Sequence, residues 1–173
     1  MRIFCAPCGS LNGSAAVYAL LDCAFRAEYC RTLPEIRKTP NGKPYFPERP
    51  EIHFSLSHAR THVLCALSDN PVGVDIESPR NISDRAIRYF SSPEELSLFD
   101  PLDLWVLKES WIKLIGGRLA LVQGLRFYRD NDIIITPDKL SLSKLYYVGD
   151  CRAAVSTFGD PPPDSIEFLI PNP

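Results

Sequence analysis

The sequence predicts an α+β protein made of two similar lobes, and three observations carry this prediction. Each half opens with a strand pattern and a helical pattern, and strand patterns of the antiparallel kind are found in both halves. The turn residues Ser68-Asp69-Asn70-Pro71 separate the halves, so we expect an N-terminal lobe over residues 1–70 and a C-terminal lobe over residues 71–173. A hydrophobic content of 45% supports one core, or two small cores that pack on each other.

The first lobe is expected to contain one helix and three strands. Residues 1–6 form a short strand pattern, and the helix follows Asn12-Gly13 with Ser14 as its N-cap. A turn over residues 39–44 precedes a strand over residues 52–57, where apolar and polar side chains alternate, and the third strand covers residues 63–67. The apolar face of the helix is defined by Val17, Leu20, Leu21, Ala24 and Phe25.

The second lobe is expected to begin with a strand over residues 72–77. Two helical patterns follow. The first covers residues 83–99 with an interruption at Ser91-Ser92-Pro93, and the second covers residues 101–115 and ends at Gly116-Gly117. The apolar stripe of that second helix consists of Leu104, Leu107, Trp111, Leu114 and Ile115. Further strands are predicted over residues 125–128, 133–136, 145–148, 152–157 and 166–170, with Pro161-Pro162-Pro163 as a rigid connector.

Charge and hydropathy exclude several classes of protein. The formal net charge is −2, so no overall positive field attracts nucleic acid or an anionic membrane. The longest apolar runs are far shorter than the roughly 18 residues of a membrane helix, and the first residues lack the apolar core of a signal peptide. We therefore expect a cytoplasmic protein that binds any anionic ligand through a local cluster of cations.

Six cysteines raise the question of a redox or zinc site. Cys5 and Cys8 have C-x-x-C spacing, but no second pair follows them. His58, His62 and Cys65 also have a spacing that zinc could use, although Cys65 fits the core side of its strand. We expect free thiols and no structural zinc.

Two carboxylates in the strand over residues 72–77 are the first candidates for chemistry. Asp75 and Glu77 lie on the same face of the strand, about 6 to 7 Å apart. Hard oxygen ligands at this spacing suit Mg²⁺, which binds a few carboxylates together with substrate phosphates. An isolated pair of this kind is also common on a solvated strand face.

The helix over residues 101–115 carries a second pair of charges. Glu109 and Lys113 are four residues apart, so they share the face opposite the apolar stripe. His58 and Ser57 lie where an earlier strand ends, and both can contact an anion. Each of these features alone also fits an ordinary surface.

The order of the motifs closely resembles that of the 4′-phosphopantetheinyl transferase superfamily. The most specific motif is W-x-x-K-E-S-x-x-K, from Trp105 to Lys113. The resemblance extends from about residue 14 to residue 124, and the segment from Arg88 to Glu95 contributes to it. The other motifs, in order, are Gly42-Lys43-Pro44, Phe54-Ser55-Leu56-Ser57-His58 and Val72-Gly73-Val74-Asp75-Ile76-Glu77.

The resemblance implies an activity and a fold. It implies Mg²⁺-dependent transfer of 4′-phosphopantetheine from coenzyme A to a serine of an apo acyl or peptidyl carrier protein, with release of 3′,5′-bisphosphoadenosine. Mn²⁺ is the second ion that we expect at the metal site. The implied fold is the pseudo-twofold pair of α+β lobes, with the active site between them, and we expect a monomer.

The resemblance also assigns roles to residues. It makes Asp75, Glu77 and Glu109 the metal ligands, and Glu109 also helps to deprotonate the carrier serine. Lys113 holds the pyrophosphate of coenzyme A. The remaining implied contacts to coenzyme A come from Lys43, Pro44, Ser57, His58 and, as a second cation near the phosphates, Lys108.

One departure and two alternatives accompany this interpretation. The two-lobed, surfactin-synthetase-activating type has a longer first lobe, with basic residues near the start of its first long helix that hold the 3′-phosphate of coenzyme A. Residues 8–19 contain no Lys or Arg, which leaves Arg26, Arg31, Arg37 or Lys38 for that role. The alternatives are a non-catalytic module that binds coenzyme A or a carrier protein, and a metal-dependent phosphohydrolase of a small nucleotide.

Overall fold

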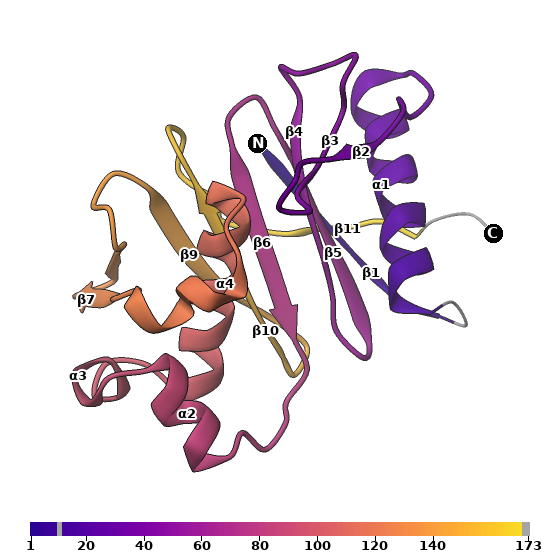
Figure 1. The fold of residues 1–173 in the computed structure, drawn as a ribbon. Helices are drawn as coiled ribbons and strands as arrows, with labels where there is room; N and C mark the ends of the chain where they lie inside the picture. Colours follow the sequence, from indigo (N-terminus) through magenta and orange to yellow (C-terminus); the bar gives the residue numbers. More distant parts are fainter. Residues whose placement is uncertain (10–11, 171–173) are drawn as a thin grey trace.

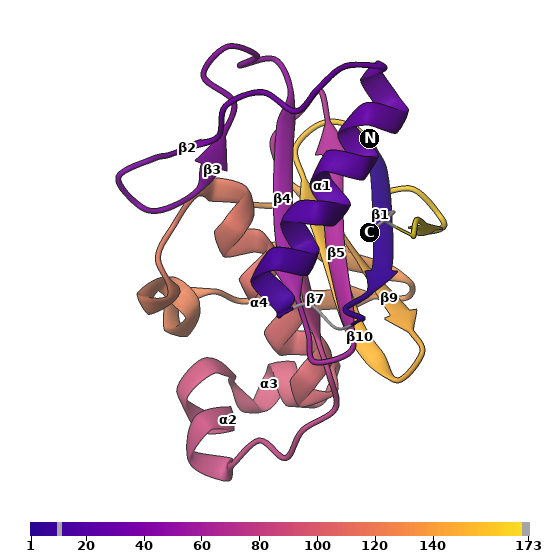
Figure 2. The same ribbon diagram turned by 90° about the vertical axis from the view of Figure 1, so that its right-hand side faces the viewer.

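The computed structural model describes residues 1–9 and 12–170, and it has four layers (Figure 1). Helix α1 (Gly13–Tyr29) covers the outer face of a first sheet with strand order β11-β1-β5-β4, as Figure 2 also shows. The first sheet packs on a second sheet with order β6-β10-β9, and helix α4 (Pro101–Ile115) covers the far side of that second sheet. The mixed α+β class agrees with the sequence prediction. The pseudo-twofold relation of two lobes stays a prediction.

The strands and remaining helices account for most of the described chain. The strands of the first sheet are β1 (Arg2–Pro7), β4 (His53–His58), β5 (His62–Ser68) and β11 (Glu167–Phe168). Those of the second sheet are β6 (Val72–Glu77), β9 (Leu142–Val148) and β10 (Cys151–Thr157). Two small hairpins pair β2 (Arg37–Lys38) with β3 (Pro44–Tyr45) and β7 (Tyr128–Asp130) with β8 (Ile133–Ile135). The short helices are α2 (Asp84–Phe90), α3 (Pro93–Leu96) and the 3-10 helix η1 (Leu119–Gly124).

Alternation along the strands builds separate cores on the two faces of the first sheet. Phe4 and Val63 face α1, whereas Ile3 and Leu64 face the second sheet. Because successive side chains of a strand point to opposite faces, a sheet covered on both sides needs apolar residues at consecutive positions. The near-continuous burial of β1 and β5 follows from this arrangement.

Strand β6 joins the two sheets through side chains. It pairs with β10 along one edge, and its other edge lies beside β4. The backbone N–H groups of Val74 and Ile76 on that edge donate to the hydroxyls of Ser55 (3.0 Å) and Ser57 (3.3 Å) of β4. Polar residues of β4 are buried here because they satisfy edge amides that would otherwise lack partners.

Helix α4 lies unusually close to β6 at Gly73. A Cβ atom on Gly73 would come within 2.0 Å of the Ser110 carbonyl oxygen and 2.3 Å of the Leu114 backbone nitrogen. Only a residue without a side chain permits this separation of the two backbones. The close approach places the polar face of α4 beside the edge of β6.

The ends of α4 are as the sequence predicts. Asp100 caps its first turn by accepting from the Leu102 N–H (2.9 Å), Pro101 occupies the first position, and Gly116 ends it with a positive φ of 64°. Trp111 is 9% exposed, which confirms its place on the buried stripe. Ile115, the last residue of α4, is 40% exposed, so its place on the buried stripe was wrong.

Several expected elements differ from the structure. Asn12, rather than Ser14, caps α1, because its side chain accepts from the Ala15 N–H (2.8 Å). The strand expected over residues 125–128 is wrong; this stretch is mostly a connection, and β7 begins only at Tyr128. Strand β11 pairs with β1 in the first sheet, although it follows the second sheet in sequence. The expected division at residue 70 stays a prediction, and residues 171–173 lie outside the described range.

No helix within the described residues is both long and apolar enough to cross a membrane.

We predict that Gly73→Ala destabilises the protein by about 3 kcal/mol or more, the upper end for an overpacked position. The new methyl group meets backbone atoms, which cannot turn away as a flexible side chain does. Gly124→Ala is the matched control, because a Cβ there meets nothing within 4 Å. Urea unfolding of both variants measures the difference. Equal stability of the two variants would contradict the close approach of α4 and β6.

The two tryptophans of α4 should differ in their contribution to stability. Trp111 is buried and donates to Ser141 (3.0 Å), so Trp111→Ala should cost about 3 to 5 kcal/mol. Trp105 is only half-buried and donates to Glu77 (3.2 Å), so Trp105→Ala should cost clearly less. Thermal and urea unfolding compare them. Similar small losses in both variants would mean that the orientation of α4 is wrong.

Candidate functional site

Three carboxylates lie in the region where α4 faces β6. Asp75 and Glu77 extend from β6, and Glu109 extends from the polar side of α4. Burial of Glu109 and the negative charge of Asp75 raise the pKa of Glu109 to about 7, and Glu77 adds to this effect while Lys113 opposes it. The three side chains are therefore close enough for their charges to interact.

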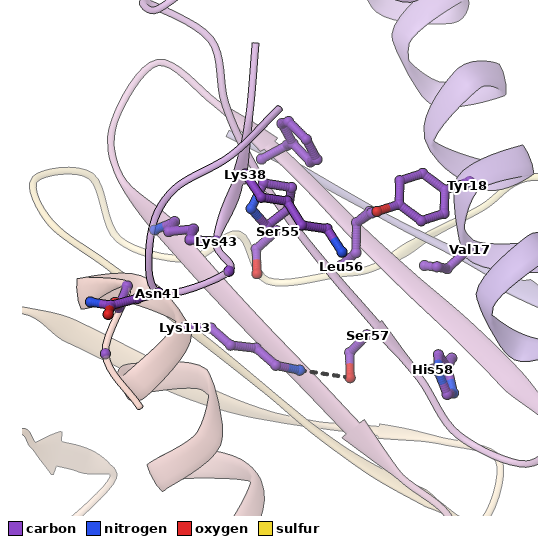
Figure 3. A pocket seen from close by; sticks show the side chains of 15 residues that line it. Val17, Tyr18, Lys38, Asn41, Lys43, Ser55, Leu56, Ser57, His58 and Lys113 are labelled. Carbon is purple, nitrogen blue, oxygen red and sulfur yellow. Dashed lines mark hydrogen bonds between the residues drawn. The ribbon is translucent and has the colours of Figure 1, made fainter. Parts of the chain in front are cut away.

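Asp75 is the centre of this group. It is 4% exposed, and its Oδ1 accepts hydrogen bonds from Ser57 Oγ (2.7 Å) and Lys113 Nζ (2.7 Å). Lys113 also donates to Ser57 (3.0 Å), as the dashed line in Figure 3 shows. The second carboxylate oxygen, Oδ2, is buried and has no hydrogen-bond partner among the described residues. A buried acceptor without a donor is costly, so this oxygen is available to a cation.

Glu77 lies nearer to solvent than Asp75. Its Oε1 accepts from Trp105 Nε1 (3.2 Å) and from Arg80 (3.3 Å). The tryptophan therefore fixes the carboxylate on the side of β6 that α4 covers. This contact gives Trp105 a polar partner on the side of α4 that faces Glu77.

The donor set fits a hard divalent cation in its chemistry. It consists of carboxylate oxygens, one of them buried and unpartnered, and their mutual repulsion is the kind that a bound cation relieves. Across residues 1–9 and 12–170, however, no three His, Cys, Asp or Glu side chains are gathered closely enough to form a complete metal site. Lys113 supplies the positive charge at Asp75 in this arrangement.

A cleft of about 320 Å³ opens beside Ser57 and Lys113. Its walls come from α1, the segment over residues 38–44, β4 and the C-terminal end of α4. Figure 3 shows Lys38 and Tyr18 extending toward Leu56, with Lys113 and His58 nearer to Ser57. The cleft thus joins a row of cationic and polar groups to the carboxylate cluster.

Lys43 and Pro44 line this cleft, as expected, but the ammonium of Lys43 is already engaged. It donates to the carbonyl oxygens of Leu114 (2.7 Å) and Val72 (3.3 Å). Burial lowers the pKa of Lys43 to about 8. In this structure Lys43 therefore ties the end of α4 to the start of β6, and its alkyl chain forms the wall.

Ser57 and His58 also line the cleft, with different freedom to bind a ligand. The Ser57 hydroxyl donates to Asp75 and accepts from Lys113 and the Ile76 N–H, which uses its full hydrogen-bonding capacity. His58 is exposed and packs against the start of α1, where a Cβ on Gly13 would lie 2.7 Å from its Nδ1. A direct contact to a phosphate therefore comes more readily from His58 than from Ser57.

The structure contradicts the prediction that Lys108 lies near the phosphates. Lys108 is fully buried, and its ammonium donates to Glu95 (3.0 Å) and to the carbonyl oxygens of Leu125 (2.9 Å) and Phe90. The helical spacing could have predicted this burial, because Lys108 is four residues after Leu104 and so lies on the apolar side of α4. Glu95 is buried as well, in a capping box with Ser92.

Three further residues line the cleft, and the sequence alone did not place them there. Tyr18 lies next to Val17 on α1 and lines the cleft with it. Asn41 donates to the Gly116 carbonyl (3.1 Å) and so fastens the loop of the β2–β3 hairpin to the end of α4. Lys38, one of four basic residues considered for the 3′-phosphate, lies in the lining. Such placements depend on tertiary contacts between segments far apart in sequence.

Comparisons with known proteins agree with the resemblance. Residues 71–155 match the family model described as the 4′-phosphopantetheinyl transferase superfamily. The 4′-phosphopantetheinyl transferase Sfp of Bacillus subtilis (strain 168) is 37% identical over 114 residues, which cover 58% of this chain and 51% of that protein. The transferase psf-1 of Bacillus pumilus is 41% identical over 91 residues, covering 46% and 39%. The transferase gsp of Aneurinibacillus migulanus is 36% identical over 90 residues, covering 46% and 37%. The matched parts span about half the length of these relatives, or less.

The raised pKa of Glu109 predicts a pH-dependent stability in the presence of a chelator. The pKa rises from 4.5 to about 7 on folding, so the protonated group favours the native state. This contribution is complete below about pH 4.5 and is lost as the pH rises through about 7. Between pH 5 and pH 8, the free energy of unfolding of the unmutated protein should therefore fall by on the order of 2 kcal/mol more than that of Glu109→Gln, which cannot ionise. Urea unfolding across this range measures it, and parallel curves would contradict the burial of Glu109 beside Asp75.

Proposed function

This chain belongs to the 4′-phosphopantetheinyl transferase superfamily, and on that premise we propose that it transfers 4′-phosphopantetheine from coenzyme A to a serine of an acyl or peptidyl carrier protein. The observation that carries the proposal is the link from Lys113 through Asp75 to the carboxylate cluster, at the edge of a cationic cleft. Phosphoryl-type transfer from an anionic donor needs cations that stabilise the charge on the phosphates, and carboxylates can hold a metal ion and accept a proton.

Coenzyme A occupies the cleft in this proposal. Lys113 contacts its pyrophosphate, since the Lys113 side chain is 31% exposed and can turn toward a ligand, whereas the Asp75 side chain is 6% exposed and stays fixed. His58 provides a further contact to a phosphate oxygen. Pro44 and the alkyl chain of Lys43 form the wall against which the nucleotide packs.

Asp75, Glu77 and Glu109 hold the metal ion in this proposal, and Mg²⁺ or Mn²⁺ suits their oxygen ligands. When bound, the ion neutralises negative charge on the phosphate groups of coenzyme A. The unpartnered Oδ2 of Asp75 supports this assignment, because a ligand atom of a cation needs no hydrogen-bond donor.

The transfer is a single displacement at phosphorus. The serine oxygen of the carrier forms a bond to the phosphorus that bears the pantetheine, and the bridging P–O bond of the pyrophosphate breaks. The leaving group is 3′,5′-bisphosphoadenosine, and the serine proton passes to Glu109. A carboxylate can accept this proton as a general base.

The partners follow from this reaction. We infer an apo carrier protein as the second substrate, a monomeric enzyme, and an active site where the two proposed lobes meet. The position of the carboxylates at the junction of β6 with β4 supports that location, since β4 belongs to the first sheet and β6 to the second.

Incubation with coenzyme A, Mg²⁺ and a panel of apo carrier proteins tests the proposal, with the mass gain of each carrier as the readout. Asp75→Ala, Glu109→Ala and Lys113→Ala should each lower transfer by about 100-fold or more, because each removes charge at the reacting phosphates. Removal of the metal by a chelator should abolish transfer in the unmutated protein.

Glu48→Ala is the control, because Glu48 is an exposed carboxylate outside the cluster, and it should keep full activity. Melting curves verify that every variant is folded. Binding of coenzyme A without a mass gain in any carrier would favour a non-catalytic binding module, and hydrolysis of coenzyme A without transfer would favour a phosphohydrolase.

A further inference from the structure

An arginine lies beside the proposed metal ligand Glu77, on the neighbouring strand. Arg152 of β10 is paired in register with Glu77 of β6, and directly opposed residues of antiparallel strands point to the same face of a sheet. Their Cβ atoms are roughly 5 Å apart in such a pair, so the guanidinium of Arg152 can reach the carboxylate of Glu77. An arginine bound there would occupy the oxygens that a metal ion needs.

In the structure, however, Arg152 is paired with Asp103 of α4. Its Nε lies 3.2 Å from Oδ1 of Asp103. Its Nη1 donates to the Asp150 carbonyl oxygen (3.4 Å), and its guanidinium carbon lies 4.8 Å from the centre of the Tyr147 ring. Within residues 1–9 and 12–170, no hydrogen bond or ion pair joins Arg152 to Glu77. Of the contacts that hold Arg152, the ion pair is the one that another carboxylate can replace.

Asp103 is well placed to hold this arginine. It lies in the first turn of α4, and its side chain is only 12% exposed. The Tyr147 hydroxyl donates to Oδ2 (3.3 Å), whereas Oδ1 is buried and accepts no hydrogen bond among the described residues. The charge of Arg152 therefore compensates a carboxylate oxygen that is otherwise unsatisfied. Separating this pair would leave a buried charge alone, which keeps Arg152 on Asp103.

Glu77 in turn keeps one carboxylate oxygen open. Its Oε1 accepts from Trp105 and Arg80, and its Oε2 has no donor in the part of the chain that the structure describes. The Arg80 contact is 3.3 Å long and its side chain is 48% exposed, so a metal ion can displace it at little cost. Arg152 is more buried, at 35% exposed, so water would screen its attraction to Glu77 less.

We propose that Asp103 is a positioning residue for the metal site: by holding Arg152, it keeps the carboxylate of Glu77 free for the cation. The inference rests on the proposed function, because it takes Glu77 as a ligand of the metal ion. Asp103 itself contacts neither the ion nor the two substrates. Helix α4 thus acts on Glu77 twice, through the hydrogen bond from Trp105 and through the restraint of Arg152.

Binding of Mn²⁺ tests the assignment, measured by the electron paramagnetic resonance signal of the free ion. Coenzyme A is present, no carrier is added, and binding to coenzyme A alone is subtracted. Asp103→Asn keeps the shape of the side chain but removes its charge, so Arg152 becomes free to bind Glu77. The affinity for Mn²⁺ should fall about tenfold, the effect of roughly one charge-assisted hydrogen bond at Glu77.

Removal of the arginine should reverse this loss. The double variant Asp103→Asn with Arg152→Gln should bind Mn²⁺ as the unmutated protein does, and Arg152→Gln alone should change the affinity little, because Arg152 is already held by Asp103. If Asp103 acted only through its negative charge, Arg152→Gln alone would tighten Mn²⁺ binding as much as Asp103→Asn weakens it. Non-additivity of the two substitutions is therefore the signature of positioning.

Asp22→Asn is the matched control. It removes a carboxylate from another Asp–Arg pair, with Arg26 (2.8 Å), on the helix that covers the outer face of the first sheet. It should leave the affinity for Mn²⁺ unchanged, and melting curves verify that every variant is folded. An unchanged affinity in Asp103→Asn, no recovery in the double variant, additive effects, or an equal loss in Asp22→Asn would overturn the role of Asp103.

The outcomes also separate this inference from the proposed function. If the unmutated protein binds no Mn²⁺, the metal assignment and the role of Asp103 both fail. If it binds Mn²⁺ and Asp103→Asn binds equally well, only the role of Asp103 fails. If the expected pattern is found and no carrier gains mass in the transfer experiment, the proposed transferase activity fails while the role of Asp103 stands.

Discussion

The close approach of α4 to β6 at Gly73 is the constraint on which the rest of the structure depends. Because a Cβ there would lie 2.0 Å from the Ser110 carbonyl oxygen, the two backbones can pack at this distance only over a glycine. The polar face of α4 then meets the edge of β6, and Lys113 reaches Asp75. The buried carboxylate cluster follows from the packing of one helix on one strand.

The same region shows how structural and chemical roles share residues. The hydroxyl of Ser57 satisfies an edge amide of β6 and also links Asp75 to Lys113. Lys43 lines the cleft with its alkyl chain while its ammonium ties the end of α4 to β6. Groups that stay in place through packing need little reorganisation when a charged ligand arrives, which is the property that electrostatic stabilisation requires.

Sequence reasoning succeeded where the signal was local. The bounds of α4 follow from Pro101 and Gly116, whose backbone preferences act within one helical turn of each end. It failed where a neighbouring residue or a distant segment competed. Asn12 caps α1 instead of Ser14. Residues 125–127 are not a strand, because their backbone binds the buried ion pair: the Leu125 carbonyl oxygen accepts from Lys108, and the Phe127 N–H donates to Glu95.

The sequence by itself determined which residue types share a face, because the periods of strands and helices fix that geometry from spacing alone. It therefore placed Asp75 with Glu77 and Glu109 with Lys113. Only the tertiary structure decided what each face meets, since that depends on contacts between segments far apart in the chain. Lys108 and Lys38 illustrate the difference: both are basic, yet packing buries Lys108 in an ion pair with Glu95 and leaves Lys38 exposed at the cleft.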